Sequence, residues 1–97
     1  MTTRVIIRPE AAADIRSARR WYRSISLQLA EDFLEELRRS IDAALERPRT
    51  FPVVYRTFRR VLLHRFPYAL FFDTEEERIT VVAVLHGARD PGVIQKR

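Results

Sequence analysis

The stretch RRVLLHRFPYALFFDTEEERITVVAVLHGARD, residues 59–90, decides the fold of this 97-residue chain. It contains three runs rich in Val, Leu, Ile, Phe and Tyr, which suit a half-buried pleated strand: residues 59–66, 68–73 and 78–86. Pro67 separates the first two runs, because proline lacks a backbone N–H and restricts the residue before it. The acidic segment TEEE separates the second run from the third. The stretch therefore predicts a three-stranded antiparallel meander.

Alternation along a strand assigns its side chains to two opposite faces. In the third run, the residues expected to share one face are Ile79, Val81, Ala83 and Leu85. The residues between them are also mostly apolar. A strand that is apolar on both faces is typical of the centre of a sheet that is covered on both sides.

The segment before the meander predicts a strand and two helices. Residues 2–8 form the expected strand, which ends at Pro9, a residue well placed at the first position of a helix. Apolar residues then recur every three to four positions over roughly 14 residues. Ser26 is the expected N-cap of a second helix that ends near Arg47, just before Pro48. Because the link between them is short, the two helices are expected to pack as an antiparallel hairpin.

A short edge strand is expected at residues 53–56, between the hairpin and the meander. We therefore predict a single α+β domain over residues 1–97, with the order β-α-α-β-β-β. It consists of an N-terminal strand, the antiparallel helical hairpin and the three-stranded antiparallel meander. A chain of this length can bury a core without disulfides or metals.

The composition narrows the class of protein. The chain has no cysteine, which excludes disulfides and thiol catalysis and fits a reducing compartment. No apolar run is long enough for a signal peptide or a membrane-spanning helix, so we expect a cytoplasmic protein with no membrane association. Neither a histidine and carboxylate cluster at metal spacing nor a glycine-rich phosphate loop is present, so no metal or cofactor is expected.

The net charge of +5 is concentrated at the entry to the meander. Residues 1–47 hold nearly equal numbers of cations and acids, whereas residues 49–65 hold five arginines and no acid. These are Arg49, Arg56, Arg59, Arg60 and Arg65. A basic strand edge is typical of a protein that binds an anionic partner, either nucleic acid or an acidic protein segment.

Five pieces of the sequence follow one another in a distinctive order: RPEAAADI, WY, LAEDFLEELRRSIDAALERP, RRVLLHRFPYALFF and VVAVLHGARDP. Together they resemble the RelE/ParE superfamily of toxins from bacterial type II toxin–antitoxin systems. The pieces FPYALFF and VLHGARDP look most like the ParE branch. The resemblance covers almost the whole chain, and it implies the same order of strands and helices that the periodicity predicts.

The resemblance implies one of two activities. Toxins of the RelE branch cleave messenger RNA in the ribosome, with basic side chains on the sheet and, near the C-terminus, an Arg followed about six residues later by a Tyr. Arg89 matches the late Arg, but Gln95 stands about where the Tyr would be. Toxins of the ParE branch inhibit DNA gyrase, which requires a binding surface and no catalytic residue. We therefore expect a gyrase inhibitor, and the alternatives are a ribosome-dependent mRNA endonuclease and a non-toxic antitoxin-binding module.

Each activity has its own candidate residues. RNA cleavage needs a base, a cation near the phosphate and an acid for the leaving oxygen. The nuclease alternative would use His86, Arg89, Arg65 and Arg59, with His64 as a second candidate base. His86 could instead be a hydrogen-bonded residue that anchors the end of its strand. The residues expected to bind a target are Arg59, Arg60, Arg65 and Arg89.

The resemblance also implies a partner, a cognate antitoxin whose C-terminal segment wraps the toxin. An amphipathic helix of the antitoxin would lie against the helical hairpin, and an extended stretch would lie along the sheet. The expected contact residues are Trp21, Tyr22, Phe33 and Leu37, with a place in the core as the alternative for the first two. Any contact with DNA is expected only through the antitoxin.

Overall fold

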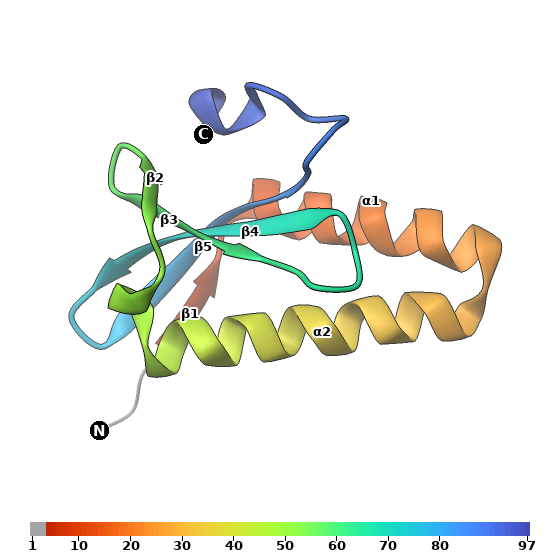
Figure 1. The fold of residues 1–97 in the computed structure, drawn as a ribbon, viewed down its shortest axis with the longest axis horizontal. Helices are drawn as coiled ribbons and strands as arrows, with labels where there is room; N and C mark the ends of the chain where they lie inside the picture. Colours follow the sequence, from red (N-terminus) through yellow and green to blue (C-terminus); the bar gives the residue numbers. More distant parts are fainter. Residues whose placement is uncertain (1–3) are drawn as a thin grey trace.

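Residues 4–97 are described by a computed structural model, in which two helices cover one face of a five-stranded sheet and the C-terminal segment covers part of the other (Figure 1). The elements are β1 (Arg4–Ile7), α1 (Pro9–Ile25), α2 (Leu27–Glu46), the 3-10 helix η1 (Pro48–Thr50), β2 (Val53–Tyr55), β3 (Phe58–Leu62), β4 (Tyr68–Glu75), β5 (Arg78–His86) and the 3-10 helix η2 (Val93–Lys96). Residues 2 and 3 of the predicted first strand lie outside the described residues.

The strand order is β1-β5-β4-β3-β2, with β1 parallel to β5 and every other neighbouring pair antiparallel. The predicted α+β fold, with its helical hairpin and its meander, is confirmed. The edge strand expected at residues 53–56 is present as β2, and it pairs with the short first strand of the meander. Within residues 4–97, no helix combines the length and the apolar content needed to cross a bilayer.

The helical hairpin begins and turns where the sequence predicts, but its link is shorter than expected. Pro9 occupies the first turn of α1, and the hydroxyl oxygen of Ser26 accepts a hydrogen bond of 3.2 Å from the backbone N–H of Leu29. Ser26 is the only residue between the two helices, because Ser24 and Ile25 continue α1. The hairpin is therefore a tight unit whose apolar stripes both face the sheet.

Aromatic side chains fill the space between the hairpin and the sheet. The rings of Tyr22, Phe33, Phe66 and Tyr68 lie 4.9–6.0 Å apart between centroids, mostly edge to face. All four residues are buried, and Phe33 is fully so. Burial of each such side chain contributes about 1.5–3 kcal/mol, and the edge-to-face pairs add to it. This cluster holds the hairpin on the sheet.

A β-bulge in β5 overturns the predicted faces of that strand. Phe71 of β4 pairs with Ala83 and Phe72 with Val81, so Val82 is an extra residue in β5. One extra residue shifts the alternation of every side chain beyond it. Ile79 and Val81 therefore face the helices as a pair, and beyond the bulge Val84 faces the helices while Ala83 and Leu85 face the other side. Both faces of β5 are covered, as predicted.

The face of the sheet opposite the helices is covered by the C-terminal segment. Val93 and Ile94 of η2 pack against a cluster that includes Phe58, Phe71 and Leu85. In Figure 1 this segment lies on the side of the sheet away from α2. The sheet is thus the middle layer of three.

Candidate functional site

The arginines of β3 do not form one cationic patch. Arg59 lies opposite Phe72 of β4 and shares the helix-facing side of the sheet. Its Nη1 donates a hydrogen bond of 2.7 Å to the backbone carbonyl of Phe51. Arg60, the next residue, points to the opposite side of the sheet because neighbouring side chains in a strand alternate. The predicted basic end of the sheet is therefore divided between its two faces.

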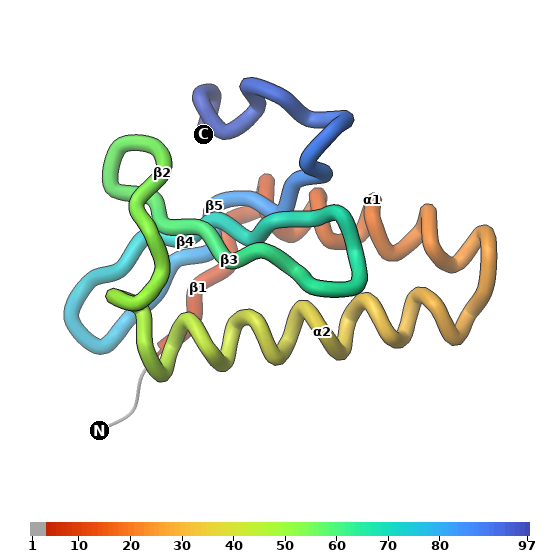
Figure 2. Tube along the Cα trace, in the orientation of Figure 1, coloured from red at the N-terminus to blue at the C-terminus, as the bar shows by residue number. Residues whose placement is uncertain are grey.

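The loop between β3 and β4 is held by acids of α2. The carboxylate of Glu36 accepts hydrogen bonds from the backbone N–H groups of His64 and Arg65, with distances of 3.2 Å to both oxygens for Arg65. The Arg65 guanidinium lies 3.3 Å from the Asp32 carboxylate. The pKa of Asp32 is lowered by the amide of Gln28 and then by Arg65. Figure 2 shows this loop above α2. The strand predicted to continue to residue 66 therefore ends at Leu62, where the chain turns into the loop.

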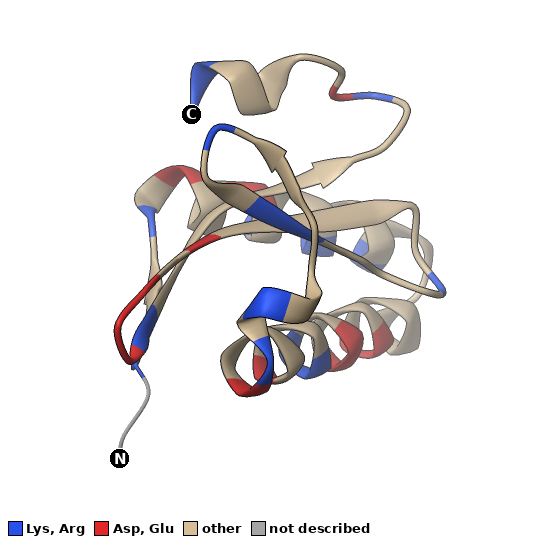
Figure 3. Cartoon of the chain, turned by 60° about the vertical axis from the view of Figure 1, so that its left-hand side comes forward, with Lys and Arg blue, Asp and Glu red and all other residues tan. Residues whose placement is uncertain are grey.

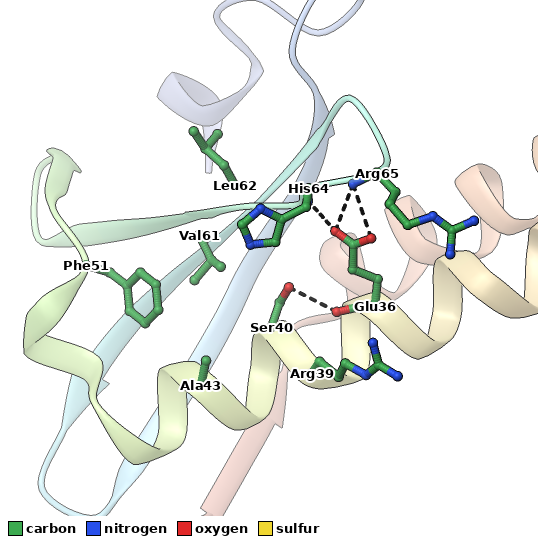
Figure 4. Close-up of a pocket in the computed structure, with 9 residues that line it drawn as sticks. All are labelled: Glu36, Arg39, Ser40, Ala43, Phe51, Val61, Leu62, His64 and Arg65. Carbon is green, nitrogen blue, oxygen red and sulfur yellow. Dashed lines mark hydrogen bonds between the residues drawn. The ribbon is translucent and has the colours of Figure 1, made fainter.

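A groove of about 520 Å³ lies between α2 and β3 (Figure 4). Its apolar lining comes from Ala43, Phe51, Val61 and Leu62, and Leu62 is 60% exposed. Its polar rim is formed by Glu36, Arg39, Ser40, His64 and Arg65. No sequence pattern marks this groove, although the alternation of β3 turns Leu62 away from the core. It is an apolar surface with charged edges, which suits an amphipathic segment of another protein.

His86 caps the turn that follows β5. Its Nδ1 accepts hydrogen bonds of 3.1 Å from the backbone N–H groups of Ala88 and Arg89. Its own backbone N–H donates to the Asp90 carboxylate at 2.7 Å, and its ring lies edge-on to Tyr68 at 5.2 Å. A neutral imidazole whose Nδ1 accepts carries its proton on Nε2, so neither nitrogen has a lone pair left for a base. This geometry favours the anchoring role over the catalytic one.

Arg89 lies on the surface beside α1. Its Nη2 donates a hydrogen bond to the hydroxyl of Tyr68, and its guanidinium lies 5.8 Å from the ring centroid of Trp21 and 5.9 Å from that of Tyr68. Contacts of this kind with aromatic faces hold a cation in place without neutralising it. Arg89 therefore keeps its charge available to a partner.

The four residues of the nuclease alternative do not converge. In β4, the residue paired with His86 is Tyr68 and the residue paired with Arg59 is Phe72, so the two sites lie about 13 Å apart along the strand. Arg65 faces Asp32 on α2, whereas Arg89 faces Trp21 on α1. Among the described residues, no group of three or more His, Cys, Asp or Glu side chains gathers as a metal site would require.

The structure corrects three of the four residues expected to contact an antitoxin. Tyr22, Phe33 and Leu37 are buried between the hairpin and the sheet, with exposed fractions of 8%, 0% and 4%. They belong to the apolar stripes of their helices, and this stripe is the side that packs on the core. Trp21 is 54% exposed, because adjacent residues of a helix point about 100° apart and its neighbour Tyr22 is the buried one.

A partly buried ion pair, which no sequence pattern predicts, joins the end of the chain to α1. The Arg97 guanidinium donates to the Asp14 carboxylate through Nη1 at 2.7 Å and Nη2 at 2.9 Å, and both side chains are only 15% exposed. Asp14 also accepts from the backbone N–H of Val84 at 3.0 Å, and Arg97 donates to the carbonyl of Val82 at 3.1 Å. β1 pairs with β5 only up to Val81. The pair therefore covers the edge of β5 that β1 leaves open.

Comparisons with known proteins agree with this fold. A family model described as the ParE toxin of the type II toxin–antitoxin system parDE matches residues 5–91. A solved structure of the chromosomal ParDE toxin–antitoxin system from P. aeruginosa superposes with a TM-score of 0.75 over 89% of this chain and 96% of that one. Its sequence identity is 17%, so this likeness concerns the fold. None of the curated proteins compared is similar to the chain in sequence.

Proposed function

Because the chain belongs to the ParE family of toxins from type II toxin–antitoxin systems, we propose that it inhibits DNA gyrase in the cytoplasm and that a cognate antitoxin neutralises it. The family membership covers residues 5–91 and so includes every strand of the meander. The target and the partner are the parts of this statement that experiments must test.

The observation that carries the proposal is the hydrogen bonding of the His86 side chain. RNA cleavage requires a group that takes a proton from the attacking hydroxyl, and arginines stay protonated near neutral pH. The imidazole of His86 is used for two hydrogen bonds to the backbone of its own turn. A protein with this arrangement is better suited to binding another enzyme than to cutting a nucleic acid.

Two of the four expected arginines fit target contact best. The side chain of Arg65 is 63% exposed, and Arg89 lies on the surface against Trp21. Arg59 is bound to the carbonyl of Phe51, and the Nε atoms of both Arg59 and Arg60 are buried. We assign contact with gyrase to Arg65 and Arg89.

The gyrase proposal is tested by a supercoiling assay with purified gyrase and toxin at micromolar concentration. We expect the toxin to abolish supercoiling and the Arg89→Gln variant to inhibit less. Arg38→Gln removes the same charge from an exposed position on α2 and serves as the matched control. Full gyrase activity in the presence of the toxin would exclude the proposal. Discrete cuts inside translated codons, mapped by primer extension after induction, would support the endonuclease instead.

We place the antitoxin in the groove between α2 and β3. β2 pairs with β3 only near its start, at Phe58 and Arg59, and the N–H of Arg60 reaches Pro52. Beyond Arg60, the outer edge of β3 has no neighbouring strand within residues 4–97. An extended segment could therefore pair with β3 while an amphipathic helix fills the groove beside Leu62. The exposed Trp21 would make a further contact with the antitoxin.

The antitoxin site is tested at its most exposed apolar residue. Leu62→Glu places a charge on the open edge of β3 beside the groove, and we expect it to weaken binding of the antitoxin by about tenfold or more in isothermal titration calorimetry. Leu27→Glu is the matched control, because Leu27 is 56% exposed at the tip of the hairpin and Leu62 is 60% exposed. Equal affinity of both variants for the antitoxin would show that the groove is not the site.

A further inference from the structure

The outward surface of α1 carries a row of arginines that no acid of the described chain balances. Four of the residues between positions 16 and 23 are arginine: Arg16, Arg19, Arg20 and Arg23. All four are exposed, and no salt bridge joins any of them to another residue in the range 4–97. The acids of the same helix are Glu10 and Asp14, and Asp14 is already paired with Arg97. The positive charge of this surface is therefore open to a partner.

The spacing of these arginines places them on one face. Residues three, four and seven positions apart are neighbours on a helix surface, and the row from Arg16 to Arg23 is about 10 Å long. Like charges at these spacings repel one another and destabilise a helix. The packing of α1 does not depend on these arginines, because the buried face of the helix is formed by Ala11, Ala18 and Tyr22.

The cationic row continues around the helix into a shallow hollow. Arg20 lines a depression of about 310 Å³ together with Ser17, Trp21, Ser24 and Arg89. Trp21 is 54% exposed, and one of its faces is approached by the Arg89 guanidinium at 5.8 Å. Cations and an exposed aromatic ring are thus adjacent at this point of the surface.

We propose that this α1 arginine surface, formed by Arg16, Arg19, Arg20, Arg23, Arg89 and Trp21, binds the phosphate backbone of nucleic acid directly. Guanidinium groups match phosphate oxygens with two parallel hydrogen bonds. One strand of duplex DNA carries a phosphate about every 3.4 Å of helix axis, so a row of about 10 Å that runs along the axis spans roughly three of them. An exposed aromatic ring beside the cations is a platform for an unpaired base.

An acidic protein segment fits the same surface less well. Arginine is common in protein interfaces, but such interfaces are centred on desolvated anchors that are seated in well-packed pockets. Here the centre is occupied by four arginines, and the one aromatic side chain lies at the margin. The proposal goes beyond gyrase inhibition, and it replaces the expectation that this chain meets DNA only through its antitoxin.

The test measures binding of the purified toxin to fluorescein-labelled 16-mers, one duplex and one single-stranded, by fluorescence anisotropy at several salt concentrations. Three backbone contacts predict a slope of log K against log salt of roughly −3 for the duplex and −2 for the single strand. Arg16→Gln combined with Arg20→Gln is expected to bring the duplex slope about two units closer to zero. Tighter binding of the single strand that Trp21→Ala abolishes would assign the surface to unpaired nucleic acid.

The matched control is Arg38→Gln combined with Arg47→Gln, which removes the same net charge from exposed positions on α2 and at its C-cap. We expect this control to retain the wild-type slope, and thermal unfolding followed by circular dichroism checks that both variants are folded. Equal loss in both variants, or no salt-dependent binding at all, would overturn the proposal. So would binding of a polyglutamate peptide that needs Arg16 and Arg20 when neither oligonucleotide binds. The assay contains neither gyrase nor antitoxin, so its result is independent of the proposed inhibition.

Discussion

The outer faces of α1 and α2 are both rich in charge, but among residues 4–97 only the charges on the outer face of α2 form ion pairs with one another. On α2, Glu35 lies 2.7 Å from Arg38 and 3.4 Å from Arg39, and the pKa of Glu35 is lowered by its hydrogen bond with Arg38. Figure 3 shows acidic and basic residues interspersed along this helix. The outer face of α1 carries arginines that have no such partner in the described part of the chain. Interspersed and paired charges such as those of α2 are sufficient to keep a helix face solvated. The excess of arginine on α1 therefore indicates a surface that binds another molecule.

The largest expected change in stability tests Asp14, the acid of α1 that forms an ion pair with Arg97. Asp14→Ala leaves the partly buried Arg97 unpaired and the N–H of Val84 without an acceptor. We expect the free energy of unfolding, measured by urea denaturation, to fall by about 3 kcal/mol. Glu10→Ala removes the other acid of α1 from an exposed first turn and should change it by only a few tenths of a kcal/mol. Similar losses in the two variants would mean that the ion pair does not support the fold.

A smaller effect, confined to alkaline pH, concerns the residue that holds Arg89 beside α1. Burial raises the pKa of the Tyr68 hydroxyl, and Arg89 offsets this only in part; burial also raises the pKa of Tyr22. When the folded pKa is above the unfolded value of about 10, the stabilisation is present below that pH and is lost as pH rises through the folded pKa. The free energy of unfolding should therefore decline above about pH 10.

The decline is expected to be shallower in Tyr68→Phe, which has one buried hydroxyl fewer. Urea denaturation at a series of pH values measures the slope, so a change in stability at neutral pH does not affect the reading. An unchanged slope in Tyr68→Phe would rule out this tyrosine as a source of the decline.

The smallest expected effect is a change in stability whose sign should differ between the two helices. Arg20→Glu turns the repulsive pairs with Arg16 and Arg23 into attractive ones, so we expect a gain of a few tenths of a kcal/mol for each pair. Arg38→Glu does the reverse on α2, because it places a second acid beside Glu35. Thermal unfolding at low salt resolves both signs. Destabilisation by Arg20→Glu would show that the α1 arginines stabilise the fold in some other way.

The sequence predicts those parts of the fold that depend on local patterns. Pro9, Ser26 and Pro48 mark the helix ends correctly, and the runs on either side of Pro67 are strands. The faces of β5 were predicted wrongly beyond Val82, because the bulge depends on how β4 and β5 pair and leaves no trace in the alternation of a single strand.

The candidate site was predicted less well, since it depends on contacts between distant residues. Asp14 and Arg97 are 83 residues apart, and no local pattern joins them. The charges of residues 1–47 nearly cancel when they are counted together, which hides the α1 arginines because most of the acids lie on α2. The prediction that Tyr22, Phe33 and Leu37 contact a partner is wrong, because the apolar stripe of an amphipathic helix packs on the core of its own domain.

The ion pair between Asp14 and Arg97 has a consequence for the chain when it is not bound to a partner. Exposed backbone groups at the side of a sheet are a template on which a second copy can add its own strand, and this is how many β-rich proteins aggregate. Beyond Val81, a carboxylate and a guanidinium occupy these groups on β5. Surplus copies of the chain are thus kept from polymerising through this side.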